Sequence, residues 1–491
     1  MFIEPLKPKM KKIEQKILDI LPRPFTSFIL WLSAIFSSFL LFKFQKSRFF
    51  ILLGGLILLL IIIIFNPLQI GIGALWVAQV FPMSFTVHLG GINFRVMDLY
   101  MVIVVLTWIT LYILPSERNK IVFGWSEFFT AMFITVFIIN VFRGIAFHYN
   151  KGNEAPIFRA DLVRGPIYYA FLFFFNKIIN LEDNAEIKLI KHWFYAAIAS
   201  SVVYFIMAAI KNYFGLMYSM WGFNIQLFVF AWGFSFTMGL LVNKKWWILT
   251  MFYFLILFYA ASRTTLGGIF LIYFFIAVFW VITSEKGTKL KNAIKIGSYT
   301  AAFLASVFII STLIFSSTQS VRIFQTISRN SVLLKPRYLQ YVPSLQWRFL
   351  ESLEAIHLWK TSSILFGTGW GKRFGATMKF LGNVDILYMT VLAKTGILGF
   401  ISFFGIYVAF FSKVWKLIKN FHLIESNFIK AFVINCAAII PTALVMGLTM
   451  SHLWFGSATI VTMVAFMAIC SKLWEKVEQK KLIELKSQKT R

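Results

Sequence analysis

Cationic side chains gather along one polar stretch of an otherwise apolar chain. Residues 317–382 contain nine Lys or Arg and two Glu, a net charge of +7. Guanidinium groups bind phosphate oxygens in a bidentate manner, and a fixed cation stabilises negative charge that develops on a leaving group. We therefore expect this stretch to work on an anionic substrate. The cations in and near it are Arg263, Arg322, Arg329, Lys335, Arg337, Arg348, Lys360, Lys372, Arg373 and Lys379.

Part of the polar stretch is predicted to be an amphipathic helix. Apolar residues recur near helical spacing across 344–360, and Pro336 and Pro343 bracket a turn before it. Such a helix needs a surface to lie on, and Arg348 stands beside its apolar stripe, where it would be held near the membrane surface. A solvated loop without a functional role is the alternative.

Glycines and two intramembrane ionisable residues follow this helix. Gly367, Gly369 and Gly371 occupy every second position, which permits close backbone approach. This segment is expected to form either a turn at the membrane interface or a turn that shapes a substrate site. No strand precedes them, so a dinucleotide-binding unit is not expected. Asp385 and Lys394 then enter an apolar segment, where ionisable groups are costly and often functional.

The elements that must position these residues are predicted to be membrane-spanning helices. The chain is 59% hydrophobic with a mean hydropathy of +0.77, and its apolar runs match the length of a helix that crosses a bilayer. We predict an all-α polytopic membrane protein with about 12–14 transmembrane helices and one long outer loop that contains the amphipathic helix. The expected spans are 28–42, 49–65, 68–82, 97–114, 123–142, 163–180, 191–210, 222–242, 246–260, 265–283, 296–315, 386–412, 429–449 and 452–471.

Clusters of lysine in alternate connections predict the orientation. The positive-inside rule places both termini in the cytoplasm and the 317–382 connection on the outer side. Cys436 and Cys470 both lie in apolar runs and are expected to be core residues. The predicted division is a basic cytoplasmic segment at 1–27, transmembrane helices at 28–316, the outer loop at 317–382, further transmembrane helices at 383–471 and a basic cytoplasmic tail at 472–491.

The order of several short motifs resembles the O-antigen ligase and O-antigen polymerase superfamily. These motifs are 262–268 at the head of a span, the outer loop with its Arg348 helix, 367–371, and the segment from 385–388 to 396–399. The resemblance implies an enzyme of the cytoplasmic (inner) membrane whose active site faces outward. Members transfer glycan from a polyprenyl (undecaprenyl) diphosphate carrier to an acceptor hydroxyl, without a metal or other cofactor. Membrane lipids, and a chain-length regulator or other glycan-assembly proteins, are further expected partners, and nucleic acid is not.

Candidate roles follow from this chemistry. Arg263 and Arg348 are the first candidates to stabilise the leaving diphosphate. Asp385 is a candidate to accept the proton of the acceptor hydroxyl or to orient a sugar hydroxyl or, equally, to be the N-cap of the following helix. A ligase histidine is missing at this place, which favours a polymerase that joins lipid-linked repeat units over a ligase acting on lipid A core. Candidate substrate-binding residues are Arg322, Arg329, Arg337, Lys372, Arg373, His357, Arg159 and Arg164.

Structural alternatives accompany the weaker candidates. His357 is also consistent with a helix-surface histidine, and Arg159 and Arg164 with an ion pair to Asp161 at a helix end. Trp347 and Trp370 are candidates to stack on sugar rings. A flippase or other transporter of lipid-linked oligosaccharide, and a scaffold in a glycan-assembly complex, remain alternative functions from other classes.

Overall fold

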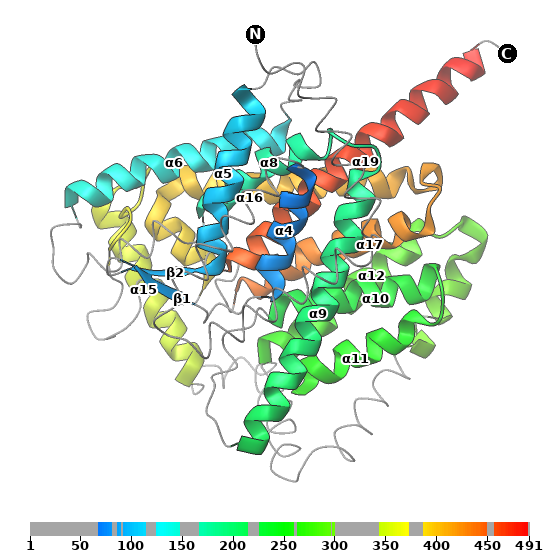
Figure 1. Ribbon diagram of the computed structural model, residues 1–491, viewed down its shortest axis with the longest axis horizontal. Helices are drawn as coiled ribbons and strands as arrows, with labels where there is room; N and C mark the ends of the chain where they lie inside the picture. The colour runs from blue at the N-terminus through cyan, green and yellow to red at the C-terminus, as the bar shows by residue number, and fades with distance from the viewer. Residues whose placement is uncertain are drawn as a thin grey trace, which may run out of the picture.

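The structure is a computed structural model that describes residues 67–80, 86–89, 92–113, 124–147, 166–214, 225–259, 263–295, 297–299, 343–372, 386–448 and 456–489. Helices make up nearly all of this part of the chain (Figure 1). The elements are α4 (Pro67–Val80), β1 (Thr86–Leu89), β2 (Ile92–Arg95), α5 (Val96–Ile113), α6 (Trp125–Phe147), η2 (Pro166–Ala170), α8 (Phe171–Ile178), α9 (Ala185–Phe214), α10 (Ile225–Leu241), α11 (Trp246–Tyr259), α12 (Arg263–Thr283), η4 (Lys286–Thr288), α15 (Pro343–Ser362), α16 (Leu387–Lys419), η6 (Phe421–Leu423), α17 (Asn427–Met446) and α19 (Ser457–Lys489).

The protein is a polytopic all-α membrane protein, which confirms the predicted fold class. In the described part of the chain, four helices are long and apolar enough to cross a membrane: α6, α16, α17 and α19. Shorter apolar helices accompany them in α4, α5, α10, α11 and α12. A helix is present over the predicted range 344–360, as α15, with Phe349 and Leu353 of the expected apolar stripe exposed.

Three local features differ from the predicted spans. The described part of the predicted 163–180 span, from residue 166 onward, is a 3₁₀ turn followed by the short helix α8, which ends at Ile178. The last span and the basic tail form one continuous helix, α19, whose C-terminal part projects beyond the other helices (Figure 1). A small antiparallel hairpin, β1–β2, was not predicted, and it pairs Thr86 with Arg95 and Leu89 with Ile92.

The core of the bundle is formed by α17 and the first half of α19. In the most apolar 18-residue segment of each helix, 67% of the residues of α17 and 78% of those of α19 are buried within the protein. The corresponding shares are 44% for α16 and 33% for α6. Large aromatic side chains fill the spaces around them, and Trp193 packs edge-on against Phe466 at 4.7 Å between ring centres. The free thiols of Cys436 and Cys470 are both buried here, as expected of core residues.

Helices α6 and α16 pack against each other in antiparallel directions. Glu127 near the start of α6 faces Lys413 near the end of α16, and Phe133 meets Phe403 at 5.8 Å between ring centres. The end of α6 therefore lies beside the start of α16. Because a helix rises about 1.5 Å per residue, the two ends of this pair are separated by roughly 25 Å. Polar side chains are found at both ends.

Candidate functional site

The glycine-rich turn after α15 docks onto a break in helix α16. Gly396 lies inside α16 with φ 65° and ψ −167°, a conformation open essentially to glycine alone. The interruption leaves backbone N–H and C=O groups without intrahelical partners, and such groups need partners inside an apolar bundle. The turn supplies those partners.

Four backbone hydrogen bonds join the turn to the broken helix. Two run from N–H groups of the turn to carbonyls just before the break, and two run from N–H groups just after the break to carbonyls of the turn. They are Thr368 N–H to Ala393 O (2.7 Å), Gly369 N–H to Lys394 O (3.1 Å), Ile397 N–H to Ile364 O (3.0 Å) and Leu398 N–H to Leu365 O (3.2 Å). The turn and the break therefore form one unit.

All three alternating glycines have positive φ, between 68° and 90°. The surroundings of Gly367 and Gly369 differ. A Cβ on Gly367 would overlap the carbonyl oxygen of Ala393, so close backbone approach accounts for this glycine. A Cβ on Gly369 would meet its nearest neighbours, on Asn140 and Arg143 of α6, at 3.5 Å or more. The turn thus serves the helix break through Gly367 and borders α6 through Gly369.

A buried cation stands behind the turn. The ammonium group of Lys394 lies 5.7 Å from the ring centre of Trp370, within the range of a cation–π interaction. Trp370 donates its indole N–H to the Phe137 carbonyl at 3.0 Å and packs on the Phe137 ring. Trp370 has no exposed surface, and its N–H and its ring already contact Phe137 and Lys394, so the expectation that it stacks on a sugar ring is wrong and Trp370 instead anchors the turn.

Two polar side chains of α6 face this turn. Asn140 is fully buried, and neither its Oδ1 nor its Nδ2 has a hydrogen-bond partner among the described residues. Arg143, nearly one turn later, places its guanidinium carbon 6.0 Å from the Phe366 ring centre. Its buried Nη1 likewise has no partner in the described part of the chain. Since an unsatisfied buried polar group costs about 1–3 kcal/mol, this pair is suited to receive a polar ligand.

Neither residue was singled out from the sequence. Asn140 lies within the predicted span 123–142, and Arg143 follows directly after its end. The available signal was their separation of three residues, which places both on one face of a helix. An ionisable residue at the end of an otherwise apolar span is itself a functional indication.

The predicted residues of α15 lie next to the same unit. Helix α15 packs on the start of α16, where Ala355 and Ala393 share a small buried cluster. Arg348 is half-buried on α15, and Lys372 follows the last glycine and is also half-buried. His357 is exposed, in agreement with its interpretation as a helix-surface residue.

The other predicted residues are placed only in part. Arg263 is the first residue of α12, which packs mainly on α17 and α10. The N-cap of α16 is Ile386, so the interpretation of Asp385 as that N-cap is wrong. Arg159, Arg164, Arg322, Arg329, Arg337, Arg373 and Asp385 lie outside the described residues.

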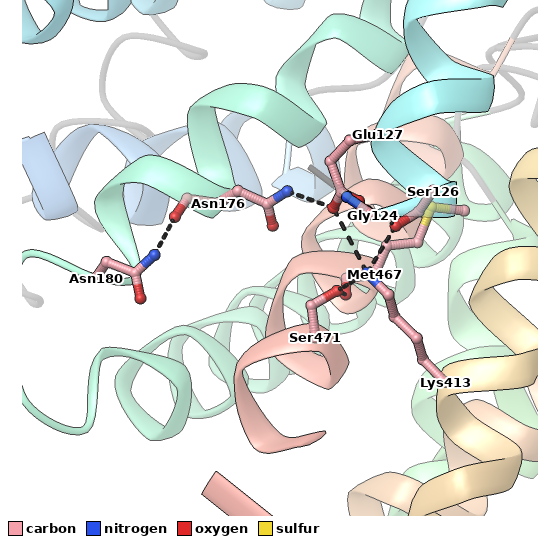
Figure 2. A network of polar contacts seen from close by, with 8 residues as sticks. All are labelled: Gly124, Ser126, Glu127, Asn176, Asn180, Lys413, Met467 and Ser471. Atoms are coloured by element: carbon pink, nitrogen blue, oxygen red, sulfur yellow. Dashed lines mark hydrogen bonds and ion pairs between the residues drawn. The ribbon is translucent and has the colours of Figure 1, made fainter. Parts of the chain in front are cut away.

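A second polar cluster occupies the opposite end of the α6–α16 pair (Figure 2). Glu127 is 2% exposed and accepts the Gly124 N–H at 3.0 Å, as the third residue of a helix does in a capping box. It also accepts hydrogen bonds from Ser126 (2.9 Å) and from Asn176 of α8 (2.8 Å).

Lys413 completes this second cluster. Its Nζ lies 3.5 Å from Glu127 Oε1 and donates to the hydroxyls of Ser126 (2.7 Å) and Ser471 (2.8 Å), which joins α6, α16 and α19 (Figure 2). Of the three donors of the ammonium group, two make hydrogen bonds to hydroxyls, and the charge is paired with the Glu127 carboxylate. The Glu127–Lys413 pair is therefore a satisfied structural connection.

The sequence matches no protein-family model, and no curated protein matches it at a significant level.

Proposed function

We propose that the protein is a polysaccharide polymerase that joins polyprenyl-diphosphate-linked oligosaccharide repeat units. In this proposal it resides in the cytoplasmic membrane, and transfer takes place at the outer end of α6 and the start of α16. The lysine-rich opposite end, with Lys413, Lys416 and Lys472, faces the cytoplasm under the positive-inside rule.

The observation that carries the proposal is a pair of polar side chains beside the glycine turn, Asn140 and Arg143, with buried atoms that have no hydrogen-bond partner among the described residues. Asn140 offers an amide that can bind a sugar hydroxyl or a phosphate oxygen, and Arg143 offers a guanidinium donor. The carrier diphosphate of a lipid-linked donor sits at the membrane boundary, so a cationic site at the end of a spanning helix suits it. Buried Lys394 adds positive charge close to the same turn.

The proposed reaction transfers a glycan to a hydroxyl. The bond between the anomeric carbon of the donor and its diphosphate oxygen breaks, a new bond forms from that carbon to the acceptor oxygen, and the hydroxyl proton goes to a base. Arg348, Arg263 and Arg143 stabilise the leaving diphosphate, and Asp385 takes the proton. Arg348, in the first half of α15, and Lys372, just after the glycine turn, add positive charge on either side of this turn.

The acceptor distinguishes a polymerase from a ligase. The position just before α16 carries Asp385 where the resembled ligases carry a histidine, which favours a second lipid-linked repeat unit as acceptor. The test incubates the purified protein with a lipid-diphosphate-linked repeat unit and no nucleotide sugar. A ladder of longer glycans supports the polymerase, whereas product that forms only after addition of lipid A core identifies a ligase.

The interrupted helix favours one second candidate, a transporter of lipid-linked oligosaccharide. Transporters commonly bind substrate at discontinuous helices, and α16 is broken at Gly396. Protein reconstituted into liposomes with a fluorescent lipid-linked unit separates the two functions. Movement of the label between leaflets without formation of longer glycans would contradict the polymerase and support the transporter.

A further inference from the structure

A cavity of about 530 Å³ lies at the lysine-rich end of the bundle, beside the Glu127–Lys413 pair. Its walls come from the start of α6, the end of α8, the last turns of α16 and the middle of α19. This volume falls within the range of small-molecule binding sites, about 300–1,000 Å³. Because α6 and α16 run antiparallel, the cavity is at the far end of these helices from the glycine turn.

The floor of the cavity is a cluster whose members are paired with one another. Lys413 donates to Ser126 and Ser471 and forms an ion pair with Glu127, and Glu127 is also held by Asn176 and by the N-terminal backbone of α6. These contacts tie four helical segments together. Because Lys413 and Glu127 are paired with each other, we consider the other side chains of the wall for recognition of an occupant.

Lys416 supplies positive charge that no carboxylate neutralises in the described part of the chain. It is exposed, and its ammonium group lies over the Trp474 ring, 5.5 Å from the centroid. Lys472 lies on the same wall, where it donates to Asn180 at 2.6 Å and lies 3.5 Å from Glu475. A phosphate can replace the surface pair of Lys472 with Glu475, since exposed ion pairs contribute little.

The charges of the wall favour an anion. Four lysines line it, against three carboxylates, and two of those carboxylates already have lysine partners. The third, Glu478, is exposed, one turn beyond Trp474 towards the C-terminal end of α19. The lining charges are Lys177, Lys413, Lys416, Lys472, Glu127, Glu475 and Glu478.

An apolar wall adjoins the cationic one. Val408 of α16 lines the cavity and is 65% exposed, and Trp125 at the start of α6 also lines it and is 70% exposed. Val408 lies about two turns of α16 before Lys416, on the side of the membrane interior. The cavity therefore presents cations at one level and lipid-facing apolar surface at the next, which is the order of a phospholipid headgroup and its acyl chains.

We propose that this cavity binds the phosphate headgroup of an anionic phospholipid. Lys416 and Lys472 bind the phosphate oxygens, Trp474 and Trp125 pack on the glycerol region, and the acyl chains follow Val408 into the bilayer. Basic pockets between helices at the cytoplasmic surface bind lipid headgroups in this way. The site does not depend on the proposed glycan transfer.

The test is native mass spectrometry of the full-length protein, released from nanodiscs that contain equal amounts of phosphatidylglycerol and phosphatidylethanolamine. The wild type should retain phosphatidylglycerol preferentially, and Lys416→Gln and Lys472→Gln should each reduce the preference about fivefold, since a lysine near an anionic headgroup contributes about 1 kcal/mol. Lys419→Gln is the matched control. Lys419 is exposed on the same helix and also lies over a tryptophan, Trp415 at 5.7 Å, but it does not line the cavity.

Three results would overturn the proposal. The first is equal retention of the two lipids by the wild type. The second is a preference that survives in the Lys416→Gln/Lys472→Gln double variant, or that falls equally in Lys419→Gln. The third is binding of soluble glycerol 3-phosphate to the delipidated protein with the affinity shown by the lipid, which would identify a small phosphate ligand. Unchanged thermal unfolding of the variants would show that a lost preference does not reflect a lost fold.

Discussion

The ammonium group of Lys394 lies 5.7 Å from the indole ring centre of Trp370, and neither side chain has exposed surface. This contact joins the broken helix α16 to the glycine turn that follows α15. A buried ammonium group is costly without compensation, and the ring face supplies part of it. Trp370 also donates to the Phe137 carbonyl of α6. On the same helix lie Asn140 and Arg143, which have buried polar atoms without a hydrogen-bond partner among the described residues.

The docking of the turn depends on Gly396. We expect Gly396→Ala to destabilise the protein by at least about 2 kcal/mol and to abolish glycan transfer, because φ 65° with ψ −167° is strained for alanine. The added Cβ would also overlap backbone atoms of Leu365 and Gly367. Thermal unfolding in detergent and the transfer assay measure the two effects. The control is Gly297→Ala, where the Cβ meets nothing within 4 Å. Equal unfolding temperatures for the two variants would contradict the docking account.

A substitution of Asn140 distinguishes a ligand-binding role of this residue from a structural role. Replacement by leucine removes a buried amide whose polar atoms have no described partner, so we expect Asn140→Leu to leave stability unchanged or to raise it by about 1 kcal/mol. Transfer should nevertheless fall by at least about tenfold, since a hydrogen bond to the substrate worth about 1.4 kcal/mol is lost. Thermal unfolding and initial rates on one preparation provide both values. Full activity in a folded Asn140→Leu protein would remove this residue from the proposed site.

The Glu127–Lys413 pair should behave as a structural unit. We expect Lys413→Met to cost about 3 kcal/mol, because it leaves the nearly buried Glu127 carboxylate without its cation. In the double variant Glu127→Gln/Lys413→Met, most of that loss should be recovered, since no uncompensated charge remains. A double-mutant cycle on the unfolding free energies measures this coupling. Additive effects of the two substitutions would show that the pair does not interact.

Composition and hydrophobic patterning were sufficient to predict the membrane fold and the loop helix. In a long apolar run that crosses a membrane, a helix satisfies the backbone N–H and C=O groups with hydrogen bonds inside the segment. The helical spacing of apolar residues across 344–360 corresponds to α15. The continuation of α19 past residue 471 was missed, because a rise in polarity marks the end of a bilayer-length run and not the end of a helix. The short α8 was missed because apolar length alone does not reveal a 3₁₀ turn.

The candidate site was predictable only in part, because its contacts join distant segments. The glycines at 367, 369 and 371 were identified from the sequence, but the turn that they form binds the break in α16 at Gly396. A glycine within an apolar run is not sufficient to predict such a break. Asn140 and Arg143 reach the turn only because α6 packs against α16 in the antiparallel direction. Trp370 was assigned to sugar stacking, and its burial depends on a carbonyl of α6 that accepts its N–H.

The most direct measurement is the product distribution from a lipid-diphosphate-linked repeat unit, incubated without nucleotide sugar. The proteins compared are the wild type, Arg263→Ala, Arg348→Ala, the double variant of these two arginines, and Lys360→Ala. Lys360 is an exposed cation of the same helix α15 and serves as the matched control. We predict a ladder of longer glycans with wild type and Lys360→Ala, and no ladder with Arg348→Ala or Arg263→Ala, although both arginine variants insert into the membrane normally. A wild type that forms no longer glycan, or an Arg263→Ala/Arg348→Ala double variant that forms the same ladder, would contradict the account.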